Sequence, residues 1–178
     1  MLYFPVGITL EMLDDTRLPV LITVGEFKAI ASWRCSIHQS DSPRFVPLSV
    51  AGVYGYRGTT GKTAGPMGDR RDVKGTIADF ERIAWKGRRV IIAYDADAED
   101  NPKVRAARRH LSSVLIERSA TVGILQWPIG DGKGIDDWLA KIGPDHVLAE
   151  IGKVKFRTPD IPPKTLGNST YLRTWVRT

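Results

Sequence analysis

The strongest strand signal in the sequence is Arg89-Val-Ile-Ile-Ala-Tyr94, which runs directly into Asp95-Ala-Asp97. A short apolar run of this kind is typical of a buried strand in a parallel sheet. In extended backbone, residues two apart face the same side, so we expect both aspartates on one face at the strand end. The carboxyl ends of parallel strands border the crevice in which α/β proteins bind ligands. The stretch therefore predicts an acidic site at one edge of a sheet.

Two carboxylates at such an edge repel each other, so a cation is their natural partner. Ligand sets made only of oxygen favour Mg²⁺ or Mn²⁺, ions that usually keep waters and bridge to phosphate. We therefore expect Asp95 and Asp97 to bind a divalent metal. A second interpretation stays open, in which one aspartate caps the following helix and the other is solvated. Asp-x-Asp after a strand also occurs in sugar-nucleotide transferases and phosphatases, so a sugar-nucleotide transferase is a further alternative.

Strands and helices are predicted to alternate on both sides of this stretch. The predicted strands cover residues 19–24, 45–50, 89–94 and 121–127. One predicted helix starts at Glu26, a second covers residues 102–118, and a third covers residues 136–142 with Asp136 as its cap. This alternation predicts an α/β fold, a small parallel sheet with helices on both faces. The glycine-rich residues 51–75 are expected to form a long loop, and Thr76-Ile-Ala-Asp79 resembles the capping box of a helix that Gly87 would close.

Length and composition bound the organisation. The chain has 178 residues, which fits one domain, here expected at 1–152, with a basic, proline-containing tail or linker at 153–178. One cysteine, Cys35, excludes an internal disulfide framework and a cysteine-rich zinc site. No stretch approaches the roughly 20 apolar residues of a membrane span. The first residues lack the basic leader of a secretory signal, so a cytoplasmic protein is expected.

Charge is unevenly distributed along the chain. Residues 153–178 hold six basic residues against one acidic residue, so most of the net charge of +6 belongs to this segment. Residues 57–89 hold nine basic residues against four acidic ones, and an acidic cluster at 95–100 follows. A basic strip beside an acidic pocket is what a metal-dependent enzyme acting on phosphates would show. A solvated helix face and a charged loop explain the same pattern, and both interpretations stay open.

Two further segments carry polar residues at predicted strand–helix junctions. In Leu21-Ile-Thr-Val-Gly-Glu-Phe-Lys-Ala29, Gly25 allows a sharp turn, and Glu26 and Lys28 enter the first turn of a helix whose N-terminus favours anions. In Asp131-Gly-Lys-Gly-Ile-Asp-Asp137, Lys133 is a candidate phosphate contact. The nearby Gly-Lys-Thr63 lacks the glycine that a phosphate-binding P-loop needs at position 56, so a P-loop is not expected.

In this order, the motifs resemble those of the Toprim family, the metal-binding domain of topoisomerases, bacterial primases and related nucleases. More closely, they resemble the Toprim-related domain of primase-like replication proteins of phages, plasmids and other mobile elements. That pattern runs T-E-G-E-x-K-A, G-V-x-G-x-R, D-x-D and K-G-x-D-D. The corresponding segments here are Thr23–Ala29, Gly52–Arg57, Asp95–Asp97 and Lys133–Asp137, within roughly residues 18–150.

The resemblance implies a Rossmann-like fold, Mg²⁺ or Mn²⁺, and nucleotidyl transfer or phosphodiester cleavage. The implied sites are listed by role: catalytic, Glu26, Asp95 and Asp97; metal, Asp95, Asp97, Asp136 and Asp137; DNA or RNA contacts, Lys28, Arg57, Arg70, Arg71 and Lys133. It also implies other replication domains, such as a helicase, as partners, and no membrane.

One position departs from the family pattern. The glutamate that ends the first strand in the family, the catalytic acid or base, is Val24 here. Valine can neither transfer a proton nor bind a metal. Two interpretations follow: a domain that has lost its catalysis, or a non-catalytic nucleic-acid or protein docking module that has kept the fold.

Overall fold

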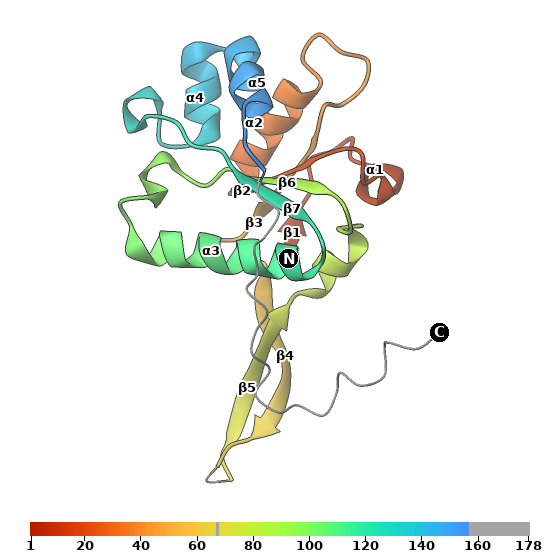
Figure 1. Ribbon diagram of the computed structural model, residues 1–178, viewed down its shortest axis with the longest axis vertical. Coiled ribbons are helices and arrows are strands. Elements are labelled where there is room, and N and C mark those ends of the chain that lie inside the picture. The colour runs from red at the N-terminus through yellow and green to blue at the C-terminus, as the bar shows by residue number, and fades with distance from the viewer. Residues whose placement is uncertain (67, 157–178) are drawn as a thin grey trace.

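The computed structural model describes residues 1–66 and 68–156 (Figure 1). The expected tail at 153–178 lies outside the described residues from position 157 onward, and its separation from the domain stays a prediction. Within the described part of the tail, Val154 and Phe156 pack against the domain core. Among the described helices, none is long and apolar enough to cross a membrane.

A five-stranded sheet forms the centre of the molecule, in the order β1-β3-β2-β6-β7. Its strands are β1 (Leu2–Tyr3), β2 (Val20–Val24), β3 (Val46–Val50), β6 (Arg89–Ile92) and β7 (Thr121–Ile124). All neighbours are parallel except β1, which pairs antiparallel with β3. Proline has no backbone N–H to donate to a neighbouring strand. Pro47 fits inside β3 because β1 pairs only with Ser49 and Val50, so β1 requires no N–H donor from position 47. The expected parallel α/β sheet is confirmed.

Helices cover both faces of this sheet (Figure 1). The helical elements are α1 (Leu10–Asp14), α2 (Glu26–Ser36), η1 (Ala78–Arg82), η2 (Ala96–Ala98), α3 (Pro102–Glu117), η3 (Ile129–Asp131), α4 (Ile135–Ile142) and α5 (Pro144–Gly152). Side chains of β2 alternate between two cores. Ile22 joins a cluster with Leu111 of α3, whereas Leu21 joins a cluster with Trp138 of α4. This alternation gives the three-layer arrangement that the sequence predicts.

Two helix starts show which capping predictions hold. Asn101 caps α3 as expected, since its side chain accepts hydrogen bonds from the backbone N–H groups of Lys103 and Val104. The prediction that Asp136 caps α4 is wrong. Gly134 occupies the N-cap position, and the carboxylate of Asp137 accepts its backbone N–H at 3.1 Å. Asp136 is thereby left without a capping role.

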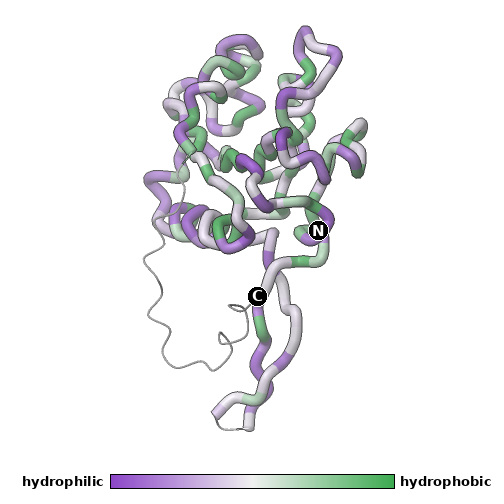
Figure 2. The backbone as a smooth tube through the Cα atoms, turned by 45° about the vertical axis from the view of Figure 1, so that its right-hand side comes forward, coloured by the Kyte–Doolittle hydropathy of each residue, from purple (hydrophilic) through white to green (hydrophobic). Residues whose placement is uncertain are grey.

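Residues 51–75, expected to be a long loop, instead contain an antiparallel hairpin of β4 (Arg57–Ala64) and β5 (Arg70–Thr76). These strands form a separate two-stranded sheet that projects away from the layered body (Figure 1). The tube in Figure 2 is mostly hydrophilic or neutral along it. Because both faces are solvated, no alternation of apolar and polar residues marks the strands in the sequence. The helix expected from Thr76 is also wrong, since only the short 3₁₀ turn η1 forms there.

One residue of the basic strip has a structural role. Arg88 is fully buried, and its guanidinium donates hydrogen bonds to the backbone carbonyls of Met12, Leu13, Leu18 and Ala84. These acceptors include the end of α1 and the turn that follows it. The charge of Arg88 therefore fixes α1 to the sheet and does not belong to a solvated surface.

Candidate functional site

The three motifs meet at the carboxyl edge of the parallel sheet. Lys28, in the first turn of α2, forms an ion pair with Asp95, which lies three residues after the end of β6. The backbone N–H of Ala96 donates to the carbonyl of Lys133 at 2.9 Å. The side chain of Lys133 lies 3.6 Å from a carboxylate oxygen of Asp97. Segments around positions 28, 95 and 133 thus form one site.

The charges at this edge come in pairs, each lysine beside one aspartate. The side chains of Lys28 and Asp95 are 20% and 24% exposed, whereas those of Lys133 and Asp97 are 65% and 38% exposed. The first pair is therefore partly shielded from water and the second is held loosely at the surface. A partly buried ion pair resists screening by salt more than an exposed one does.

Gly134 lies close to the side chains of both Lys28 and Asp136 at this edge. A Cβ atom on Gly134 would meet the ends of the Asp136 and Lys28 side chains, which would have to move aside. One carboxylate oxygen of Asp136 is buried and has no hydrogen-bond partner among the described residues. A buried carboxylate oxygen without a donor is costly, so it marks a position at which a ligand would be stabilised. Asp136 therefore belongs to the site, whereas Asp137 is occupied as the α4 cap.

Two residues at the end of β2 lie at the border of the site. Glu26 is exposed at the start of α2, and within the described part of the chain no hydrogen bond or ion pair joins its carboxylate to the aspartates. Val24 ends β2 and packs partly buried against the core cluster that contains Tyr94. The predicted catalytic role of Glu26 stays a prediction.

Oxygen ligands for a hard cation exist at this edge, but they are not gathered into a cage. Over residues 1–66 and 68–156, no group of three or more acidic, histidine or cysteine side chains is placed to hold a metal. Asp95 and Asp97 offer carboxylate oxygens, the ligands that Mg²⁺ prefers, and Asp136 offers an unsatisfied one. These carboxylate oxygens fit Mg²⁺ or Mn²⁺, with water and phosphate as further ligands. The metal would compete with Lys28 for the carboxylate of Asp95.

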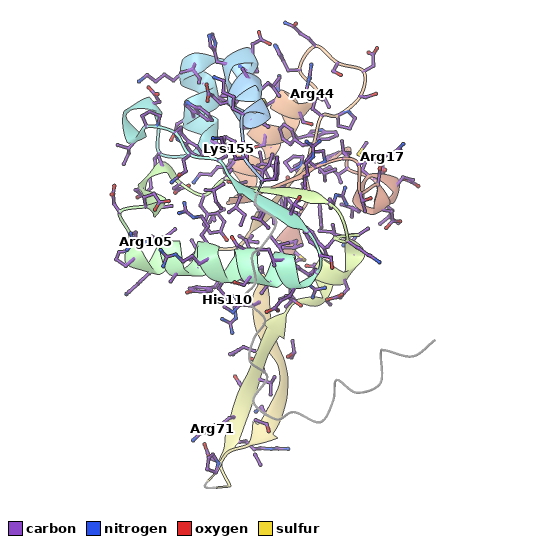
Figure 3. All side chains as sticks on the ribbon, in the orientation of Figure 1. Arg17, Arg44, Arg71, Arg105, His110 and Lys155 are labelled. Carbon is purple, nitrogen blue, oxygen red and sulfur yellow. The ribbon has the colours of Figure 1, made fainter. Side chains whose placement is uncertain are left out.

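The basic residues expected to contact nucleic acid separate into two groups. Lys28 and Lys133 lie at the sheet edge, whereas Arg57, Arg70 and Arg71 lie on the hairpin. Figure 3 shows Arg71 near the end of the hairpin that is farthest from the sheet. The structure therefore does not bring all five into one surface.

A groove at the base of the hairpin was not predicted from the sequence. It has a volume of about 420 Å³, and the residues that line it include Tyr56, Arg57, Lys74, His110 and Arg118. The Tyr56 hydroxyl lies 2.7 Å from Nδ1 of His110, and burial raises the pKa of Tyr56 to about 12. Arg118 donates to Glu81, which lowers the pKa of that carboxyl. The spacing that places His110, Val114 and Arg118 on one side of α3 and its C-cap was the available signal, but only the hairpin's position makes it a groove.

The fold and site define an α/β domain with a mostly parallel sheet whose carboxyl edge carries paired lysines and aspartates. The chain belongs to the family described as a domain of unknown function (DUF3854), whose model matches residues 10–146. A search of curated proteins gave no match. Among solved structures, the chain is similar to the crystal structure of the Aquifex aeolicus primase (zinc-binding and RNA polymerase domains). The identity is 15% and the TM-score 0.48, over 83% of this chain and 28% of that one.

Proposed function

We propose that this chain is a Toprim-like nucleic-acid-binding domain of a primase-like DNA replication protein of a phage, plasmid or other mobile element. The observation that carries the proposal is the meeting of Lys28, Asp95 and the Lys133 segment at one sheet edge. These segments are far apart in the sequence, and each holds one motif of the resemblance to Toprim domains. Other replication domains, a helicase among them, would be its partners.

At this edge, the lysines would bind nucleic-acid phosphates. A phosphate that approaches Lys28 or Lys133 can take the place of the carboxylate to which each is now paired. The released Asp95 and Asp97, with Asp136 near, would then hold Mg²⁺ or Mn²⁺ together with the phosphate. The metal, when bound, would stabilise charge on a transferring phosphate.

Val24 favours a second candidate function, a nucleic-acid or protein docking module without catalysis. The missing glutamate removes general acid–base help, which is typically worth about 10²–10⁴-fold in rate. Glu26 is exposed at the start of α2, and the family pattern has an acid at that position as well, so it offers no evident replacement. We expect the chain to bind nucleic acid and to show little primer synthesis or strand cleavage.

The binding proposal is tested with the full chain and Mn²⁺, by calorimetry and by fluorescence anisotropy of labelled single-stranded DNA. Asp97→Asn removes one charge and nearly keeps the shape, and should abolish Mn²⁺ binding. Asp41→Asn, at an exposed position in the turn after α2, is the matched control and should leave it intact. Mn²⁺ binding that survives in both Asp95→Asn and Asp97→Asn would exclude the proposed metal site.

A second variant separates the two candidate functions. Val24→Glu returns a carboxylate to the end of β2 and should tighten Mn²⁺ binding by adding a third anionic ligand. It should also lower stability without metal, since three carboxylates then repel one another. If its Mn²⁺ affinity equals that of the parent chain, position 24 does not face the metal site, and the alignment of Thr23–Ala29 with the family motif is wrong.

A further inference from the structure

We propose that the hairpin arm, residues 57–76, inserts into the major groove of double-stranded DNA. This inference rests on the proposed function only in taking nucleic acid as the ligand. It concerns a surface separate from the sheet edge, and it names duplex DNA as the partner of that surface.

The shape of the arm suits a groove. β4 and β5 pair from Arg57 with Thr76 to Ala64 with Arg70, so the ribbon is about 25 Å long. A register shift between Thr59 and Gly61 marks a bulge, which strengthens the right-handed twist of a ribbon. An isolated two-stranded hairpin is marginally stable in water, and beyond its base no other element of residues 1–66 and 68–156 covers either face of this one. A binding partner would supply the missing stabilisation.

The charge of the arm fits a polyanion. Five basic side chains, those of Arg57, Lys62, Arg70, Arg71 and Lys74, stand against two acidic ones, those of Asp69 and Asp72. Asp69 pairs with Arg71 at 2.7 Å and Asp72 pairs with Lys74 at 3.1 Å. The charges of the other three basic residues are therefore not balanced within the arm.

The composition of the arm favours duplex DNA over single strands and RNA. Residues 57–76 include no aromatic residue, whereas proteins that bind single strands rely on aromatic side chains for base stacking. The major groove of B-form DNA, about 12 Å wide, admits a two-stranded β-ribbon. The major groove of an RNA duplex is too deep and narrow for side chains to enter. Small residues such as Gly58, Gly61 and Thr63 keep the ribbon slim enough for close approach.

The test uses the full chain, labelled duplex DNA of about 20 base pairs, and the variant Arg70→Glu/Arg71→Glu. The matched control is Arg34→Glu/Lys86→Glu, which changes the net charge equally at exposed positions on the body. We expect the arm variant to bind duplex DNA at least about tenfold more weakly, and its salt slope to fall by about two, as two phosphate contacts are lost. The control should stay within about twofold of the parent.

Three outcomes would overturn the inference. One is an equal loss of duplex DNA affinity in the arm variant and the control, which would show that net charge alone explains the loss. Another is an equal loss of affinity for single-stranded DNA or duplex RNA in the arm variant, which would show that the arm does not select duplex DNA. The third is competition by the minor-groove ligand distamycin but not by the major-groove ligand methyl green. Melting temperatures of both variants should match that of the parent, since the arm forms a sheet of its own.

Failure here is distinguishable from failure of the proposed function. If the chain binds neither nucleic acid nor Mn²⁺, the proposed function is wrong. If single strands and Mn²⁺ bind and depend on Lys28 and Asp97, but duplex binding ignores the arm variant, only the inference about the arm is wrong.

Discussion

Lys28 and Asp95 form an ion pair across 67 positions of sequence, joining the first turn of α2 to the N-cap of η2, three residues after the end of β6. The pair puts a positive charge next to the carboxylate that the Asp-x-Asp pattern assigns to a metal. One lysine thus serves two exchangeable partners, Asp95 in the free protein and a phosphate in the proposed complex.

Replacing Lys28 should separate metal binding from phosphate binding. Lys28→Met keeps the length of the side chain and removes its charge, so Asp95 loses its competing partner. We expect Mn²⁺ affinity to rise roughly tenfold, the effect of one partly exposed charge, and single-stranded DNA affinity to fall. Calorimetry and anisotropy measure the two, with Lys86→Met as an exposed control. If both affinities fall together, Lys28 does not compete with the metal.

Gly134 offers a test of how tightly the site is packed. Gly134→Ala requires the ends of the Lys28 and Asp136 side chains to shift and replaces the glycine N-cap of α4. It should cost about 0.5–1 kcal/mol of unfolding free energy. Gly130→Ala, in the same loop, meets no atom within 4 Å and should change stability by less than about 0.5 kcal/mol. Urea unfolding compares the two variants. Equal stabilities would contradict the close approach of α2 and α4 at the site.

Arg88 should be among the most sensitive basic residues to substitution. Arg88→Met removes the guanidinium donor from four backbone carbonyls, of which that of Leu13 keeps the N–H of Ala84, and should destabilise the chain by about 3 kcal/mol. Lys86→Met, two residues away and exposed, should cost less than about 0.5 kcal/mol. Thermal unfolding gives the comparison, and a small loss in both variants would show that the carbonyls find water when the guanidinium is removed.

Alkaline pH should weaken the fold through Cys35. Burial raises the pKa of this thiol from 9.0 to about 11, so the unfolded chain loses the proton first as the pH rises. Stability is therefore fully present below about pH 9 and declines as the pH approaches 11. Cys35→Ala should flatten this decline in urea titrations at successive pH values. A decline of the same slope in the variant would assign it to other groups, such as the buried Tyr56.

The layered body could be predicted from local patterns. The apolar runs that end at Val24 and Tyr94, and the cap at Asn101 followed by Pro102, each lie within a short window of sequence. Burial on both faces requires such runs, so the sheet and its helices leave a readable trace. The Asp-x-Asp strand end likewise predicted where polar residues gather.

The hairpin arm, the burial of Arg88 and the pairing of Lys28 with Asp95 were decided only by the tertiary structure. The arm is solvated on both sides, so it has no hydrophobic period to detect. Arg88 is buried because carbonyls from a distant helix and turn surround it, and Lys28 meets Asp95 because α2 begins at the sheet edge where β6 ends. Sequence patterns record which side chains must avoid water, whereas the partners of a charge depend on distances that only the packed chain sets.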